Sequence, residues 1–334
     1  MQIKEITQIL RSLLVLFIAV LLAACHKGGE ESISYGLIRK NIQIAGIQRR
    51  YAMYVPSGIS ESLPMPLVFE LHGGGIYIED MTGESGHKSP FKLWMDLAEK
   101  DKFIVVYPEG LDGAYGKPTW NDCRGDCTVS SDADDVHFID TLISVISAGY
   151  PINSDRIYVS GLSNGGFMAQ RLGIELRDKI AAISSVVASK PAVSECIDPP
   201  APISILFMFG TNDNHVPYNG GYLSNPPNPS HGSVISVAST IDYWVNFNHT
   251  DTIAEYKLFP DLDPDDGGVV ERFSYKNGTA NTEVIFYKIN GAGHSAPSIK
   301  ERYSALFEQS FNKQNHDIEM TTEVWKFFRD KRLR

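Results

Sequence analysis

The chain has 334 residues, of which 43% are hydrophobic and 21% charged, and its formal net charge at pH 7 is −10. This is the composition of an ordinary globular protein, and it excludes a disordered chain, a collagen-like repeat and a coiled coil. The acidic balance argues against nucleic acid as a partner, because like charges repel a polyanion.

The first 24 residues have the pattern of an export signal rather than of a folded element. Lys4 and Arg11 give the segment a positive start, and residues 13–22 form an unbroken apolar run. A bilayer-spanning helix needs about 20 apolar residues, so this run is too short to cross a membrane comfortably. The pattern predicts that residues 1–24 are a signal peptide, which is removed from the mature protein.

The end of this segment resembles the lipobox of bacterial lipoproteins. Leu22-Ala23-Ala24 place small residues directly before Cys25. We expect Cys25 to carry the lipid that attaches the exported protein to a membrane, in the periplasm or at the cell surface. The alternative is an ordinary secretory signal with a cysteine there by chance. Residues 25–35 are polar and predict a short tether.

From residue 36 onward, short apolar runs alternate with segments of helical periodicity. The expected strands cover residues 37–44 and 48–55 as an opening hairpin, then 66–71, 103–107, 156–160, 182–187, 203–209 and 283–289. The expected helices cover residues 90–100, 135–148, 164–176, 232–247 and 320–329. Continuous β-branched and aromatic runs are typical of strands buried on both faces of a parallel sheet. The alternation predicts a single α/β domain over residues 36–334, with a mostly parallel central sheet flanked by helices.

Two segments between these elements differ from the rest. Residues 211–232 are rich in Asn, Pro, Gly and Tyr and predict a long ordered loop, which is often functional. Residues 261–267 superficially resemble a calcium-binding loop. The sixth position of such a loop is Asp266 instead of Gly, and the twelfth is Arg272 instead of Glu, so a solvated acidic turn is the better interpretation.

The segment Gly161-Leu162-Ser163-Asn164-Gly165 has the form G-x-S-x-G. It lies between an expected strand and an expected helix, which is the context of a nucleophile elbow. In that turn the serine hydroxyl projects beyond the sheet, where a substrate carbonyl can reach it. The sequence therefore predicts Ser163 as a catalytic nucleophile.

A serine nucleophile needs a base, and the base needs an acid that orients it. Asp213 and His294 follow Ser163 in the order Ser, Asp, His, and each comes just after an expected strand. We therefore expect Ser163, Asp213 and His294 to form a catalytic triad. The acidic residues 261–266 are runner-up acids. His215 is a rival base that lies too near Asp213 in sequence to occupy the loop after the last strand.

The tetrahedral intermediate of acyl transfer needs hydrogen-bond donors for its oxyanion. One is expected from the backbone N–H of Asn164, directly after the nucleophile. The other is expected from His72-Gly73-Gly74-Gly75, which follows a strand as the corresponding loop does in lipases and esterases. We expect the N–H of Gly74 to serve, with Gly73 and Gly75 as less favoured alternatives.

Four cysteines occur in the sequence. If Cys25 carries lipid, Cys123, Cys127 and Cys196 remain for one disulfide and one free thiol in an exported protein. The proximity of Cys123 and Cys127 favours that pair, and a bond from Cys196 to one of them is the alternative. A zinc site is not expected, because no CxxC motif or histidine cluster accompanies the cysteines.

Taken together, these motifs resemble the polyhydroxybutyrate depolymerase and feruloyl esterase family of α/β-hydrolases, which includes secreted LpqC-like esterases. The resemblance spans roughly residues 36–300. It is carried by His72-Gly73-Gly74-Gly75, Trp120-Asn121-Asp122, Asp134-Asp135-Val136, Gly161-Leu162-Ser163-Asn164-Gly165-Gly166, Gly210-Thr211-Asn212-Asp213, Val216-Pro217-Tyr218 and Gly293-His294.

The resemblance implies an α/β-hydrolase fold, the Ser163–Asp213–His294 triad, and no metal or organic cofactor. It also implies hydroxyalkanoate esters or oligomers as substrates, with feruloyl or acetyl esters of plant polysaccharide as the alternative. Trp120 and Tyr218 would line the cleft, unless they simply pack in the core. The sequence departs from the family pattern at Gly74, often Cys, and at His137, often Gly, and neither change removes a catalytic group.

The sequence shows no separate polymer-binding domain after the catalytic domain, so shorter or soluble esters are expected as substrates rather than crystalline polyester. Two rival functions share some of these features. A prolyl-oligopeptidase-like peptidase has a similar elbow at Ser163, although it usually carries a propeller domain. A non-catalytic surface lipoprotein would have no need of a complete triad. The sequence does not indicate an oligomeric state.

Overall fold

The computed structural model describes residues 34–60, 62–197 and 201–333. Residues from Tyr35 onward form one compact unit. The expected signal peptide, Cys25 and the tether up to residue 33 lie outside the described residues. Within the described ranges, no helix has both the length and the apolar character needed to cross a membrane.

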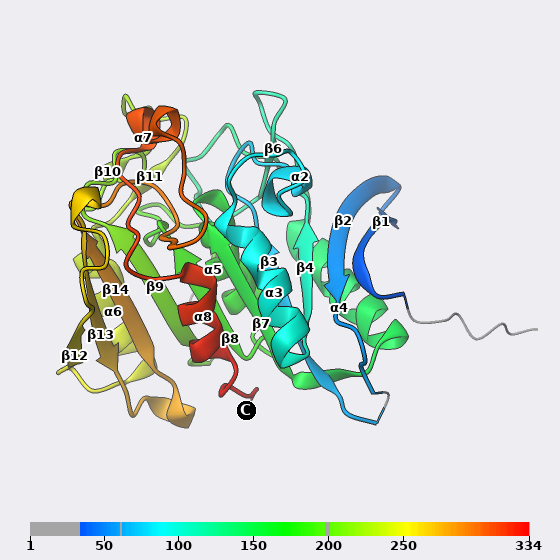
Figure 1. The fold of residues 1–334 in the computed structure, drawn as a ribbon. Helices are drawn as coiled ribbons and strands as arrows, with labels where there is room; N and C mark the ends of the chain where they lie inside the picture. Colours follow the sequence, from blue (N-terminus) through cyan, green and yellow to red (C-terminus); the bar gives the residue numbers. More distant parts are fainter. Residues whose placement is uncertain (1–33, 61, 198–200, 334) are drawn as a thin grey trace, which may run out of the picture. The chain divides into compact units, whose positions relative to one another are not determined.

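The apolar runs of the sequence form one large sheet (Figure 1). Its strands are β1 (Gly36–Ile44), β2 (Ile47–Val55), β3 (Met65–Leu71), β4 (Ile104–Pro108), β7 (Ile152–Leu162), β8 (Ala182–Val186), β9 (Ser204–Gly210), β12 (Glu255–Leu258), β13 (Val269–Tyr275) and β14 (Val284–Asn290). Their order across the sheet is β1-β2-β4-β3-β7-β8-β9-β14-β13-β12. The six neighbours from β4 to β14 are parallel, whereas β1, β2, β12 and β13 pair antiparallel at the two edges.

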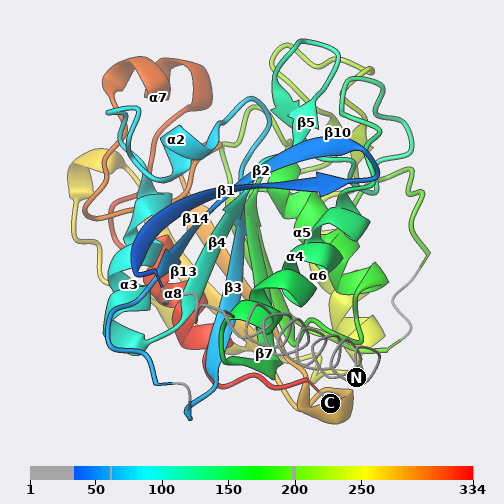
Figure 2. The same cartoon turned by 90° about the vertical axis from the view of Figure 1, so that its right-hand side faces the viewer.

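Helices cover both faces of this sheet. The helices are α2 (Ile78–Met81), α3 (Leu93–Asp101), α4 (Asp135–Gly149), α5 (Asn164–Glu175), α6 (Val237–Asn248), α7 (Ala305–Phe311) and α8 (Met320–Phe328). Short 3-10 turns lie at Pro90–Lys92, Pro264–Asp266 and Thr279–Asn281, and short two-residue strand pairs are β5 (Leu111–Asp112) with β6 (Pro118–Thr119) and β10 (Gly221–Tyr222) with β11 (Ser233–Val234). Figures 1 and 2 show α3 and α8 on one face and α4, α5 and α6 on the other.

The hydrophobic core is formed by the central strands, which are buried on both faces. Every residue of β3, β4, β8 and β9 is buried, as the continuous apolar runs predict. On one face, α8 places Phe328 against Tyr158 of β7 and Trp94 of α3, with ring centroids 4.9 and 6.5 Å apart. The predicted α/β-hydrolase architecture, including the opening antiparallel hairpin, is confirmed.

The structure differs from the sequence-based expectation mainly at one edge. Strands β12 and β13 and helix α7 were not among the expected elements, and α6 begins at Val237 instead of residue 232. The expected loop 211–232 contains the short strand β10, which pairs with β11 just beyond the loop. The acidic turn at 261–267 is only partly solvated, because Asp266 is buried.

Candidate active site

Ser163 connects the end of β7 to the start of α5. Its backbone has φ 54° and ψ −120°, a conformation that a non-glycine residue adopts only at an energetic cost. Its N–H donates to the carbonyl of Val186 on the neighbouring strand at 2.9 Å, which holds the turn in place. A methyl group on Gly165 would collide with the carbonyls of Leu71 and His72, so glycine is required for this close approach to β3. The strand, turn and helix expected around Ser163 are present.

The structure brings His294 and Asp213 to Ser163 in the arrangement that proton transfer requires. His294 Nε2 lies 2.9 Å from Ser163 Oγ, and its Nδ1 lies 2.7 Å from Asp213 Oδ2. A carboxylate beside Nδ1 keeps the proton on that nitrogen, which leaves Nε2 free to accept the proton of the serine hydroxyl. The N–H groups of His215 and Val216 each donate to Asp213 Oδ1 at 2.8 Å and orient the carboxylate.

The three side chains come from loops at the carboxyl ends of β7, β9 and β14. These parallel strands end at the same edge of the sheet, which is where open α/β sheets bind their ligands. Asp213 and His294 are only 8% and 7% exposed, so their interaction is little screened by water. The arrangement can deprotonate a serine hydroxyl and stabilise the imidazolium that results.

The rival groups occupy other positions. His215 stacks on His294 with ring centroids 5.4 Å apart, and its Nδ1 lies 2.8 Å from Asn214 Oδ1. Burial, followed by the proximity of His294, lowers the pKa of His215 to about 4, so its ring is neutral at pH 7. The acidic segment 261–266 is not at His294. The oxygens of Asp266 instead accept backbone N–H groups of Gly268 and His316, each at 2.6 Å.

The loop of His294 is held by the segment around α7. The N–H of His294 donates to the carbonyl of Phe311 at 2.7 Å, and the N–H of Gly293 donates to the carbonyl of Lys313 at 2.8 Å. The side chain of Asn312 donates to the carbonyl of Asn212 at 2.7 Å, next to Asp213. One segment therefore supports both the base and the acid of the triad.

Gly74 and Asn164, whose backbone N–H groups are the expected oxyanion donors, lie at the nucleophile. Gly74, Ser163 and Asn164 all line the same cleft. Asn164 is the first residue of α5, where a backbone N–H has no partner within the helix. The N–H of Gly75 donates to the carbonyl of Pro118 at 2.8 Å, so this alternative donor already has an acceptor. This geometry favours Gly74 over Gly75.

His72 fixes the start of the glycine loop from the inside. It is fully buried, and burial lowers its pKa to about 4, so the ring is neutral. Its Nε2 accepts the N–H of Gly110 at 2.9 Å, which places the ring proton on Nδ1. Nδ1 then donates to the carbonyl of Gly73 at 2.8 Å. The imidazole thus connects the glycine loop to the loop that follows β4.

The cleft above Ser163 has a volume of about 350 Å³. Its walls combine apolar side chains with a few polar groups. Besides the triad serine and histidine and the oxyanion loop, its lining includes Tyr115, Lys117, Thr119, Arg124, Val129, Ser130, Phe167, His215, Val216, Leu223, Ser224, His231 and Phe311. Tyr115 and His231 stack with centroids 5.9 Å apart, although they come from different loops.

Of the two expected substrate contacts, the structure contradicts that of Trp120. Trp120 is fully buried, since its ring packs 4.7 Å from the His72 ring and its indole donates to the His72 carbonyl behind the cleft. Tyr218 is half-buried but not part of the cleft lining. Sequence reasoning missed Arg124 and Phe311 instead. Arg124 lies close to Trp120-Asn121-Asp122 and could have been found through that motif, whereas nothing in the sequence around Phe311 indicated its position.

The preferred disulfide was also wrong. Cys123 pairs with Cys196, and Cys127 is a free thiol whose Sγ lies 3.3 Å from Ser130 Oγ. The physical reason is a backbone pairing between segments distant in sequence. The N–H of Glu195 donates to the carbonyl of Cys123 at 2.9 Å, and the two bonded cysteines come within 5.3 Å between Cα atoms.

Within the part of the chain that the structure describes, no group of three or more His, Cys, Asp or Glu side chains is placed to hold a metal ion. The groups gathered at Ser163 are those of nucleophilic acyl transfer, which needs a nucleophile, a base, an orienting acid and two oxyanion donors.

Comparison with known proteins agrees with this chemistry. No protein-family model matches the chain. The chain is 27% identical over 266 residues to NocK of Nocardia uniformis subsp. tsuyamanensis, which carries the name of an esterase, covering 77% of this chain and 73% of that protein. It is 33% identical over 178 residues to feruloyl esterase B of Piromyces equi, and 29% identical over 182 residues to the bifunctional acetylxylan esterase/xylanase XynS20E of Neocallimastix patriciarum.

The last two matches cover 52% and 54% of this chain. In return, the chain spans only 31% and 24% of the length of these two relatives. The relatives of this chain are therefore esterases, and they include feruloyl and acetylxylan esterases.

Proposed function

We propose that this protein is a serine esterase that hydrolyses carboxylic esters through an acyl-enzyme on Ser163. The observation that carries the proposal is the continuous chain of short contacts from Ser163 Oγ to His294 and on to Asp213, at 2.9 and 2.7 Å. Relatives that are named as esterases support the same reaction class.

The mechanism follows from the positions of these groups. His294 Nε2 takes the proton of Ser163 as its Oγ attacks the ester carbonyl, and Asp213 stabilises the imidazolium. The N–H groups of Gly74 and Asn164 donate to the developing oxyanion. His294 then gives its proton to the leaving alcohol, which departs as the acyl-enzyme forms. Water, activated by His294, attacks the acyl-enzyme and releases the acid and free Ser163.

The names of the relatives favour feruloyl or acetyl esters of plant polysaccharide over the hydroxyalkanoate esters that the sequence placed first. A cleft of about 350 Å³ is large enough for a small acyl group or a single aromatic ring. We propose a soluble or oligomeric ester as the substrate, and the ester panel below distinguishes the two classes of acyl group.

The test is hydrolysis of p-nitrophenyl acetate, p-nitrophenyl butyrate, methyl ferulate and a 3-hydroxybutyrate trimer by the wild type and by Ser163→Ala. Loss of the triad nucleophile is expected to lower kcat by roughly 10⁴-fold or more. A fluorophosphonate probe should label the wild type at Ser163 and leave the variant unlabelled. Cleavage of an aminoacyl-proline amide in place of every ester would instead assign a peptidase, and near wild-type activity of Ser163→Ala would exclude the proposal.

We also propose that the protein is exported and held at a membrane by a lipid on Cys25. The support is the sequence before this cysteine, a positive start, an apolar run and small residues. Cells expressing the full chain should incorporate radiolabelled palmitate into the wild type. The Cys25→Ser variant should incorporate none, and equal labelling of the two would refute the anchor.

A further inference from the structure

The loop from Pro118 to Asp122 contacts both sides of the oxyanion hole. On the glycine-loop side, Trp120 Nε1 donates to the carbonyl of His72 at 2.9 Å, and the carbonyl of Pro118 accepts the N–H of Gly75 at 2.8 Å. These two bonds hold the loop on either side of Gly74. Because glycine has more backbone freedom than any other residue, a glycine loop needs such anchors to keep an N–H in one direction.

On the nucleophile side, the same loop is bound to the side chain of Asn164. The N–H of Trp120 donates to Asn164 Oδ1 at 2.7 Å, and Asn164 Nδ2 donates to the carbonyl of Trp120 at 3.1 Å. Asn164 Nδ2 also donates to Asp122 Oδ2 at 2.6 Å. A single residue, Trp120, thus connects the loop of Gly74 to the residue whose backbone N–H is the second oxyanion donor.

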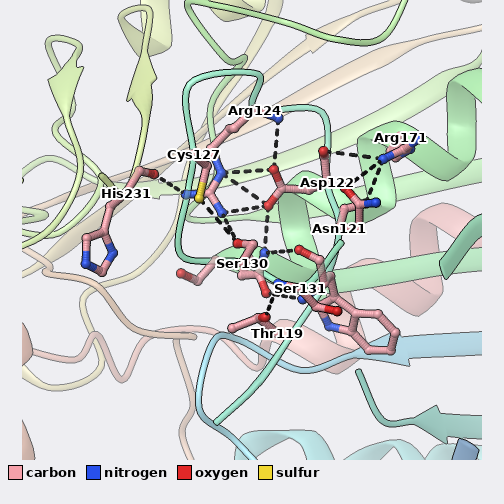
Figure 3. Close-up of polar contacts among 12 residues, drawn as sticks. Thr119, Asn121, Asp122, Arg124, Cys127, Ser130, Ser131, Arg171 and His231 are labelled. Atoms are coloured by element: carbon pink, nitrogen blue, oxygen red, sulfur yellow. Dashed lines mark hydrogen bonds and ion pairs between the residues drawn. The ribbon is translucent and has the colours of Figure 1, made fainter. Parts of the chain in front are cut away.

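The loop itself is held by buried charges (Figure 3). Arg124 Nη2 and Nε donate to the carboxylate of Asp122 at 2.7 to 3.1 Å, and both residues are buried. Burial alone would lower the pKa of Arg124, but the paired carboxylate of Asp122 outweighs it and raises that pKa. From α5, Arg171 Nη1 donates to the carbonyl and side-chain oxygens of Asn121 at 3.0 and 3.1 Å. The Trp120-Asn121-Asp122 motif is therefore fixed at each of its three residues.

We propose that Trp120, through its indole N–H and its backbone bonds to Asn164, is a positioning residue that sets the separation of the two oxyanion donors. The inference rests on the proposed esterase function. Oxyanion donors act only when they lie about 2.7–3.1 Å from the developing charge and are already oriented before the reaction. The donors of Gly74 and Asn164 come from different loops, so their separation depends on a group that binds both loops.

The experiment compares two buried tryptophans. Trp120→Phe keeps an aromatic ring and removes the N–H that binds the His72 carbonyl. Trp244→Phe in α6 is the matched control, because Trp244 is 1% exposed and its Nε1 has no hydrogen-bond partner in the described part of the chain. We expect Trp120→Phe to lower kcat by roughly 10- to 100-fold with little change in KM, as misplaced donors would. Trp244→Phe should keep wild-type kinetics.

A trifluoromethyl ketone supplies a second readout, because its adduct on the serine carries an oxyanion. Its inhibition constant should rise in Trp120→Phe by about the factor by which kcat falls. Equal kinetics and inhibition in Trp120→Phe and Trp244→Phe would overturn the inference, because Trp120 would then act only as packing.

Asn164→Ala gives an independent variant in case Trp120→Phe folds poorly. It keeps the backbone N–H that serves as donor and removes only the side-chain bonds to Trp120 and Asp122. It should lower kcat by a similar factor. The kcat of the Trp120→Phe/Asn164→Ala double variant should be little lower than that of the worse single variant, because both changes disturb the same distance between the two oxyanion donors. Multiplied losses in the double variant, or a wild-type kcat in Asn164→Ala, would contradict a shared role.

The same measurements distinguish failure of the esterase function from failure of the positioning role of Trp120. A folded wild type that hydrolyses no ester would remove the proposed function and, with it, the inference. Serine-dependent hydrolysis, together with equal behaviour of the two tryptophan variants, would leave the esterase intact and refute the inference alone.

Discussion

At the scale of single residues, the buried carboxyl group of Glu70 makes stability depend on pH. Glu70 lies on β3, is 1% exposed, and accepts a hydrogen bond from Trp94 Nε1 at 2.7 Å. Burial raises its pKa from the ordinary value of 4.5 to about 8. Between these two pH values the folded protein keeps a proton that the unfolded chain has lost. The contribution of Glu70 to stability is therefore complete below pH 4.5 and is lost as the pH rises toward about 8.

Replacing Glu70 with Gln should remove this dependence. The amide oxygen can still accept from Trp94, and a neutral group has no proton to lose. We propose to measure urea unfolding of the wild type and of Glu70→Gln at several pH values from 5 to 8. As the pH rises, the unfolding free energy of the variant should increase relative to that of the wild type, by up to about 1.4 kcal/mol per pH unit. Parallel curves over this range would show that Glu70 is ionised in the folded protein.

The residues of the site differ in how far the sequence could predict them. The sequence predicted the triad because each of its members, Ser163, Asp213 and His294, follows a strand end. They also occur in the order Ser, Asp, His that is typical of such hydrolases. Trp120 could not be placed in the same way. An aromatic residue in a loop can face a cleft or lie behind one, and only the partner of its indole N–H, the His72 carbonyl, decides between the two.

At the scale of elements, the segment that follows β14 depends on glycine beside the catalytic base. A methyl group on Gly293 would overlap the carbonyl oxygen of Phe311, which is the group that accepts the His294 N–H at 2.7 Å. Gly293→Ala must therefore move the α7 segment away from the loop of His294. We expect a destabilisation of about 1–3 kcal/mol and a fall in kcat, because His294 loses its backbone anchor.

Gly149→Ala at the end of α4 is the control. A methyl group there meets nothing within 4 Å. Alanine also suits a helix better than glycine, so this variant should be neutral or slightly stabilised. Urea midpoints and kcat of the two variants give the comparison, and a Gly293→Ala protein with wild-type kcat would mean that α7 does not position His294.

The elements that the sequence did not predict share a physical cause. Central strands such as β9 are buried on both faces and appear as continuous apolar runs, whereas all four residues of β12 are exposed. No residue of α7 is buried, and its Phe307 and Phe311 stack on each other with ring centroids 4.5 Å apart instead of entering the core. The edge strand β12 forms because β13 supplies its hydrogen bonds, and a sequence pattern carries little of that information.

At the scale of the whole described unit, the Cys123–Cys196 disulfide connects loops that form the wall beside the active site. The segment before Cys196 pairs with strand β11 (Ser233–Val234). The N–H of Ala192 donates to the carbonyl of Ser233 at 3.0 Å, and Pro191 bridges to Val234. The loop of Cys123 also carries Trp120 and Asp122, so the disulfide lies close in sequence to the residues proposed to position the oxyanion donors.

Removing this bond should cost stability because it closes a long loop. The cysteines are 73 residues apart in sequence, and a bond across a long loop restricts the unfolded chain strongly. We expect the Cys123→Ala/Cys196→Ala double variant to lose about 2–4 kcal/mol of unfolding free energy. The double replacement prevents Cys127 from forming a substitute bond. Cys127→Ser, which removes only the free thiol, should unfold like the wild type.

Urea unfolding without reductant measures the loss, and the wild type with dithiothreitol should approach the double variant. The kinetics then separate two roles of the bond. If it only restricts the unfolded chain, the double variant keeps its kcat under conditions where it is fully folded. If it also steadies Trp120, kcat falls in the folded variant while KM changes little, as in Trp120→Phe. We expect the second result, because Cys123 is only three residues from Trp120 and its own carbonyl accepts the N–H of Glu195 at 2.9 Å.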